Sequence, residues 1–179
     1  MLRFWTLFSL LAVIASRPAA SEGTGAGEIS LLSPPLWQAL DRALVEGREN
    51  SRVTLVFVHA RGCGPCRLME NEVMPQVRLL LEQMALAKLD MADNSTRLVV
   101  NNAVLTPSGT ARQLGMESTP GFVLVDPEGK PILRENGLLD ARAFGLFLAY
   151  GTTGAYRYGS FADYAIAMRG LPGEAAGGR

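Results

Sequence analysis

The chain has 179 residues, which is enough for one domain with a substantial hydrophobic core. Lys and Arg together number 17, and so do Asp and Glu, so the balanced charge gives no reason to expect nucleic acid or an anionic membrane surface as a partner. The hydrophobic content of 48% and the charged content of 19% fit a globular protein.

The N-terminal residues 1–21 have the layout of a secretory signal peptide. Arg3 supplies a small basic start, residues 4–15 form an almost unbroken apolar run, and small residues follow as far as Ser21. The run is shorter than the ~20 apolar residues that span a bilayer comfortably. We therefore expect cleavage and export, and an uncleaved N-terminal anchor is the alternative.

The glycine-rich residues 22–32 are predicted to form a flexible lead-in to a single domain over 33–168. Ser33, followed by two prolines, is predicted to cap a first helix whose apolar residues recur at helical spacing over 36–47. The β-branched and apolar run 52–59 predicts a buried strand.

The remaining elements follow from the same patterns. In chain order, we predict a helix over 66–84, a strand over 85–91, a polar loop, a short helix over 110–114, a hairpin with strands over 122–125 and 131–134, a helix over 140–150, and a short helix over 160–168. Pro75 should kink the first of these helices because it has no N–H for the helical ladder. The tail, residues 169–179, is expected to be disordered.

The chain has only two cysteines, Cys63 and Cys66, directly after the first predicted strand. An exported domain stapled by disulfides would carry more cysteines, spaced further apart. A bridge that closes so short a loop removes little entropy from the unfolded chain and contributes little to stability. The pair therefore indicates chemistry, and an inert pair of buried cysteines is the alternative.

The segment from about Val53 to Tyr150 resembles the thioredoxin family. Four features match in order: Cys63-Gly64-Pro65-Cys66, a strand lysine at Lys88, Thr119-Pro120 before a strand, and Gly129-Lys130 in a hairpin turn. The resemblance implies an α/β thioredoxin fold, in which a βαβ unit and then a ββα unit form a central mixed sheet flanked by helices. It also implies a thiol–disulfide oxidoreductase without a cofactor or a metal.

A narrower resemblance extends from Cys63 to Tyr164. This stretch looks like the periplasmic thioredoxins of bacterial sulfur-oxidation operons, the SoxW-like type, and implies a periplasmic location. It rests on four segments, with the sequences Ser-Thr-Pro-Gly-Phe at 118–122, Gly-Lys at 129–130, Gly-Ala-Tyr at 154–156 and Ser-Phe-Ala-Asp-Tyr at 160–164.

Two positions depart from the thioredoxin pattern. Thioredoxins have Trp immediately before the first cysteine, where this chain has Gly62. They bury an Asp on the strand six residues before that cysteine, where this chain has Phe57. The acid that helps to deprotonate the second cysteine is therefore missing at that position, and we expect water or another side chain to handle the proton.

Cys63 is predicted to be the nucleophile, because the start of a helix favours a thiolate and lowers the thiol pKa below its free value of about 8.5. Cys66, one turn further on, should resolve the mixed disulfide. Pro65 rigidifies the first turn, and Gly64 allows a partner's backbone to approach.

The Thr119–Pro120 bond is predicted to be cis, with an ordinary trans turn proline as the alternative. The family resemblance implies that this loop faces the two sulfurs and keeps metal off them. It also implies that Thr119 pairs with an extended substrate.

Several further side chains near the motif each have two possible roles. His59, the only histidine, could tune Cys63, carry a proton or bind a metal, or it could simply end a strand. Arg61 and Arg67 flank the motif and could stabilise a thiolate, or they could be ordinary exposed arginines. Lys88 is expected under the active site by resemblance, but without the buried acid its partner is undefined.

The function predicted from these features is reduction of disulfides on exported client proteins, in the periplasm and by a monomer. The Gly64-Pro65 dipeptide resembles that of reducing thioredoxins, whereas strongly oxidising periplasmic enzymes usually have His there. Electrons would come from a membrane thiol conduit, because the compartment has no reducing pool. The alternatives are a disulfide oxidase or isomerase, and a non-enzymatic copper-binding module that uses His59, Cys63 and Cys66.

Overall fold

The computed structural model describes residues 35–100 and 102–169. The predicted signal peptide, the lead-in, the Ser33 cap and the tail from residue 170 onward lie outside this part of the chain. Arg169, which we assigned to the tail, is instead the last residue of a helix. Within the described residues, no helix has the length and apolar character needed to cross a membrane.

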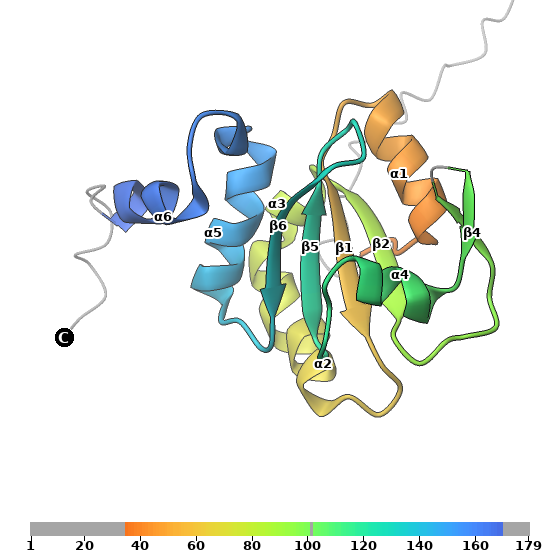
Figure 1. Ribbon diagram of the computed structural model, residues 1–179. Helices are drawn as coiled ribbons and strands as arrows, with labels where there is room; N and C mark the ends of the chain where they lie inside the picture. Colours follow the sequence, from red (N-terminus) through yellow and green to blue (C-terminus); the bar gives the residue numbers. More distant parts are fainter. Residues whose placement is uncertain (1–34, 101, 170–179) are drawn as a thin grey trace, which may run out of the picture. The chain divides into compact units, whose positions relative to one another are not determined.

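A four-stranded sheet forms the centre of the domain, in the order β2-β1-β5-β6 (Figure 1). Strands β1 and β2 are parallel, whereas β5 runs antiparallel to both β1 and β6. The mixed sheet and the α/β thioredoxin-type fold predicted from the sequence are therefore confirmed. The strands are β1 (Thr54–His59), β2 (Ala85–Asp90), β5 (Gly121–Val125) and β6 (Pro131–Asn136).

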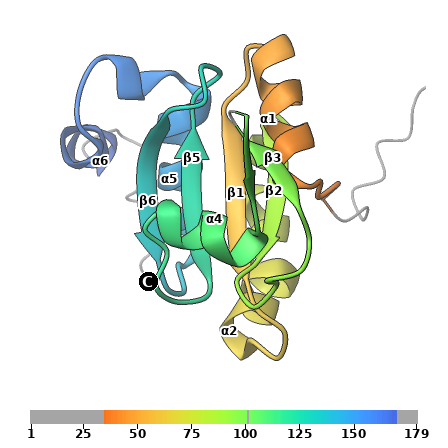
Figure 2. The same cartoon turned by 45° about the vertical axis from the view of Figure 1, so that its right-hand side comes forward.

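Helices cover both faces of the sheet, because alternate residues of the buried strands point to opposite sides. Leu55 and Phe57 belong to a core cluster with residues of the helical segment after the cysteines and of α5 (Ala141–Thr152). Val56 and Val58 belong to a second cluster with residues of α1 (Leu40–Glu49) and α4 (Pro107–Gln113). Figure 2 shows α4 in front of the sheet and α5 behind it.

The first helix begins later than predicted, at Leu40 rather than residue 36. The chain before it is extended and bridges the outer edge of β2. The N–H of Gln38 donates to the C=O of Leu86 at 2.9 Å, and the N–H of Lys88 donates to the C=O of Gln38 at 3.1 Å. Pairing with the sheet edge therefore takes the backbone groups that a longer helix would have used.

The predicted helix over 66–84 is a helical segment of changing type. It comprises α2 (Gly64–Leu68), the π-helical η1 (Met69–Val73), the 3-10 turn η2 (Met74–Val77) and α3 (Arg78–Leu81). Regular α-helical bonding gives way to a 3-10 turn at Pro75, because proline cannot donate to the ladder, and the kink predicted there stays a prediction.

The predicted polar loop contains a small hairpin that the sequence analysis missed, formed by β3 (Leu98–Val100) and β4 (Ala103–Leu105). The helix after it starts at Pro107 rather than residue 110, because Thr106 caps it by accepting the N–H of Gly109 at 3.1 Å. The turn between β5 and β6 forms as predicted. In it, the N–H of Gly129 donates to the C=O of Asp126, and the N–H of Lys130 donates to the Asp126 carboxylate.

The C-terminal part packs on α5 through aromatic rings. It consists of a 3-10 turn, η3 (Ala155–Arg157), and a helix, α6 (Phe161–Arg169), predicted over 160–168. The Tyr150 ring contacts the rings of Tyr156, Phe161 and Tyr164, and its hydroxyl donates to the C=O of Gly159 at 2.7 Å.

Candidate active site

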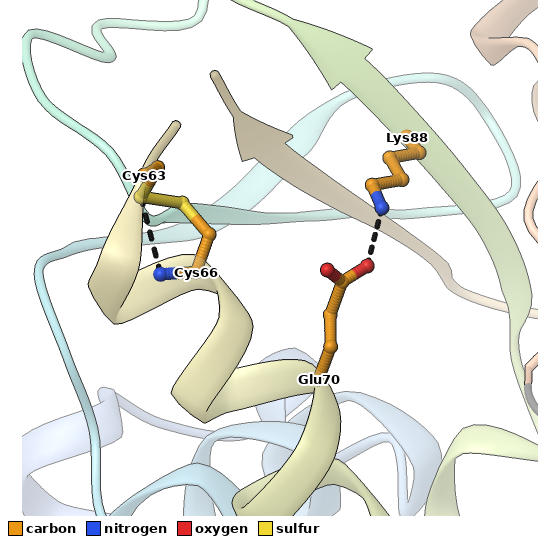
Figure 3. Close-up of a disulfide and its surroundings, with 4 residues drawn as sticks. All are labelled: Cys63, Cys66, Glu70 and Lys88. Atoms are coloured by element: carbon orange, nitrogen blue, oxygen red, sulfur yellow. Dashed lines mark hydrogen bonds and ion pairs between the residues drawn. A yellow bond between two sulfur atoms is a disulfide. The ribbon is translucent and has the colours of Figure 1, made fainter. Parts of the chain in front are cut away.

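The two cysteines lie at the junction between β1 and α2. The chain leaves β1 at His59 and turns through Gly62, whose φ of 79° is in the left-handed region that glycine adopts easily. Cys63 is the N-cap of α2, and Cys63 and Cys66 are joined by a disulfide (Figure 3). The N–H of Cys66 donates to the Cys63 Sγ at 3.1 Å, so a backbone donor already points at the sulfur of the predicted nucleophile.

The two sulfur-bearing residues differ in exposure. Cys63 is partly buried and lies at the margin of the core cluster that contains Phe57, whereas Cys66 is only 3% exposed and belongs to that cluster. Beside them, Pro65 is exposed, and the space around Gly64 is open, with no atom within 4 Å of where a Cβ would lie. A partner protein therefore reaches the Cys63 sulfur more easily than the Cys66 sulfur. This agrees with the roles predicted for the two cysteines, which stay predictions.

Phe57 takes the place of the family's buried acid as part of an aromatic core. Its side chain is fully buried and stacks on Phe122, with ring centroids 5.4 Å apart. The Trp37 ring lies 5.5 Å from it on another side. Phe57 therefore has a packing role at this position, and it offers no carboxylate that could receive a proton.

Lys88 has the partner that the sequence analysis could not name. Its Nζ forms an ion pair with the Glu70 carboxylate, from the π-helical segment that follows the cysteines (Figure 3). The same Nζ lies 5.5 Å from the centroid of the Phe57 ring. Glu70 was missed because the motif was read only as far as Cys66; the signal was an acid four residues later on the same helical face.

His59 lies half-buried at the end of β1, beside Asp90 in the parallel register. Burial lowers its pKa from the ordinary 6.5, and the positive charge of Lys88 lowers it further, while Asp90 and Glu70 act in the opposite direction. The ring centroid is 5.9 Å from that of Phe57. Across the described residues, no group of three or more His, Cys, Asp and Glu side chains is arranged to hold a metal ion.

The Thr119–Pro120 peptide bond is cis. Gly121, the next residue, pairs with Val58 near the C-terminal end of β1, so this loop lies at the same end of the sheet from which the chain leads to Cys63. Pro120 is buried and Thr119 is half-buried. Arg61 and Arg67, on either side of the motif, are both exposed.

Comparison with known proteins agrees with this fold. A thioredoxin-like domain family matches residues 40–152, well over half of the chain. A thioredoxin-fold protein from Helicobacter pylori is similar with a TM-score of 0.53 and 18% identity, over 72% of this chain and 94% of that one. A thioredoxin from Thermus thermophilus is similar with a TM-score of 0.52 and 23% identity, over 69% and 95%. At these identities the two structures support the fold alone.

No match was found among curated proteins. The thioredoxin-like fold together with the close pair Cys63–Cys66 indicates a thiol–disulfide oxidoreductase. On the family match over 40–152, the chain belongs to the thioredoxin-like domain family.

Proposed function

We propose that this protein is an exported reductase of protein disulfides, of the periplasmic SoxW-like type. The observation that carries the proposal is the unequal pair at the start of α2. Cys63 is partly exposed and its sulfur receives the N–H of Cys66, whereas Cys66 is buried. A partly exposed sulfur that faces a backbone donor suits a thiolate, and a buried sulfur within bonding distance suits the resolving step.

In the proposed reaction, the Cys63 thiolate attacks one sulfur of the client disulfide and forms a mixed disulfide. The other client sulfur leaves with the electron pair as a thiolate. Cys66 then loses its proton and attacks the Cys63 sulfur, which releases the second client thiolate. Two electrons pass to the client, and the protein is left with the Cys63–Cys66 disulfide described above.

The direction of exchange is argued from the dipeptide between the cysteines. Gly64 and Pro65 carry no side chain that stabilises a thiolate, which leaves the reduced pair less favoured than in strongly oxidising enzymes. The oxidised protein must be reduced again by a thiol conduit in the membrane, because its compartment has no soluble reducing pool. The client is an exported protein with an accessible disulfide.

Turnover on a protein disulfide tests the proposal. With dithiothreitol as electron source, the protein should accelerate reduction of a model protein disulfide, and Cys63→Ser should abolish the acceleration. The matched control is Leu79→Ala, because Leu79 is 72% exposed on α3, away from the cysteine motif. Equal rates for Cys63→Ser and the unaltered protein would refute a dithiol mechanism.

Export is tested separately by cell fractionation and mass determination of the mature chain. We expect a periplasmic protein cleaved between residues 15 and 21. A full-length chain in the membrane fraction would favour the uncleaved anchor instead.

A further inference from the structure

Cys66 needs a proton acceptor, and its surroundings supply few. The thiolate is the species that attacks in disulfide exchange, and burial in apolar surroundings opposes thiolate formation. Cys66 is 3% exposed and belongs to the apolar core cluster that also contains Phe57 and Met69. Bulk water therefore reaches the thiol poorly, and the acceptor should be a nearby side chain.

Four titratable side chains besides the cysteines come together beside this core. Glu70 comes from η1, His59 from β1, and Lys88 and Asp90 from β2; the charges of the other three all act on His59. The Lys88 ammonium has no free electron pair to receive a proton. The Asp90 carboxylate accepts the N–H of Ala92 beyond the end of β2, which directs it toward that turn.

Glu70 is the carboxylate best placed for Cys66. It follows Cys66 by four residues in one continuous helical segment, and residues at that spacing lie one above the other on the same face. Figure 3 shows the side chains of Cys66 and Glu70 rising from successive turns on the same side of the helix. The ion pair with Lys88, itself lying over the Phe57 ring, holds the half-buried carboxylate in place.

We propose that Glu70 accepts the proton of the Cys66 thiol, directly or through one water, in the step that resolves the mixed disulfide. The Cys66 S–H bond breaks, Glu70 becomes protonated, and the Cys66 thiolate attacks the Cys63 sulfur. The Cys63–client bond breaks, and its electron pair leaves with the client thiolate. Glu70 returns its proton to that thiolate or to water, so the carboxylate is regenerated.

This inference rests on the proposed thiol–disulfide exchange and gives the second half of it a named base. Lys88 is then a positioning residue: it fixes the carboxylate and does not itself take the proton. In this arrangement the acid comes from the helix rather than from β1, where Phe57 has no group that can receive a proton.

The test isolates the step made by Cys66. The reduced mature protein is mixed in a stopped-flow instrument with a nitrothiobenzoate disulfide, which releases one coloured thiolate when Cys63 attacks and a second when Cys66 resolves the mixed disulfide. The rate of each phase is measured between about pH 6 and 9, a range that spans the free thiol pKa of about 8.5. The variants are Glu70→Gln, Glu70→Asp, Lys88→Met and His59→Gln. Glu72→Gln is the matched control, since Glu72 is an exposed acid in the same π-helical segment.

We expect Glu70→Gln to slow the second phase about 10²-fold near pH 7, a typical contribution of one general base. The loss should shrink as pH rises, because hydroxide then takes over the proton. The first phase should change by less than about twofold, as for any step without this proton transfer. Glu70→Asp should recover part of the rate, Lys88→Met should lose less than Glu70→Gln, and Glu72→Gln should match the unaltered protein.

Three results would overturn the inference. An unchanged rate of the second phase in Glu70→Gln would mean that water, and not Glu70, accepts the proton. Equal slowing in Glu70→Gln and Lys88→Met, with the same pH profile as the unaltered protein, would make the ion pair purely structural. Loss of the second phase in His59→Gln with Glu70→Gln unaffected would assign the proton to His59. A Glu70-dependent second phase in a protein that fails to reduce protein disulfides would contradict the reductase proposal and leave this inference standing.

Discussion

Phe57 is the residue through which the packing of the active-site core can be tested most sharply. Its ring is fully buried, stacks on Phe122 with centroids 5.4 Å apart, and lies 5.5 Å from the Trp37 ring. Truncating such a ring removes its transfer free energy and leaves a cavity, together about 3–5 kcal/mol for Phe→Ala. Because native domains are stable by only about 5–15 kcal/mol, Phe57→Ala should remove a large part of the free energy of unfolding.

Urea denaturation of the oxidised protein measures this loss. Phe57→Ala should move the unfolding midpoint to a lower urea concentration. The slope of the free energy of unfolding against urea should stay the same, since a changed slope would signal an altered denatured state. Leu79→Ala, at a site 72% exposed, should stay within about 0.5 kcal/mol of the unaltered protein. A loss below about 1 kcal/mol in Phe57→Ala would show that the Phe57 ring is not packed as described, because truncating a fully buried ring costs more than that.

Three further predictions concern roles, pH and capping. Cys66→Ser should trap a mixed disulfide with a client on Cys63, visible on a non-reducing gel; adducts with Cys63→Ser instead would reverse the roles. Burial, and then the charge of Lys88, lower the pKa of His59 from 6.5 in the folded protein. As pH falls, His59 is therefore protonated in the unfolded chain at a higher pH than in the folded one. Stability should therefore fall below about pH 6.5, and it should fall less in His59→Gln by urea denaturation at each pH; equal slopes would exclude His59 as the cause. Asp140 caps α5 by accepting the N–H of Ala143 at 2.7 Å, so Asp140→Ala should cost about 1 kcal/mol in the same assay, and no loss would show the cap to be dispensable.

The sequence was sufficient for the elements whose signals are local. The run 52–59 is rich in β-branched and apolar residues and is buried in the structure from Val53 to Val58. The turn at 126–129 has a glycine with a φ of 88° where the chain must reverse. The break at Pro75 follows from a missing N–H, a property of that residue alone. Such features were predicted because each depends on residues close together in the chain.

Features that depend on distant pairing were not predicted. Gln38 lies in a run with helical spacing, but it is extended because β2 offers an edge for it to join. The strands β3 and β4 have three residues each, too few for an alternating pattern to be seen. The ion pair of Glu70 with Lys88 joins residues 18 apart in sequence, and only the packing of η1 over the sheet brings them together.

The reduction potential of the Cys63–Cys66 pair decides whether this protein reduces or oxidises the disulfides of its clients. It can be measured by equilibrating the protein with glutathione or thioredoxin buffers and separating the oxidised and reduced forms after alkylation. We expect a value near about −270 mV, that of a reducing thioredoxin. A value near about −120 mV, that of a strong periplasmic oxidant, would contradict the reductase proposal and favour a disulfide oxidase.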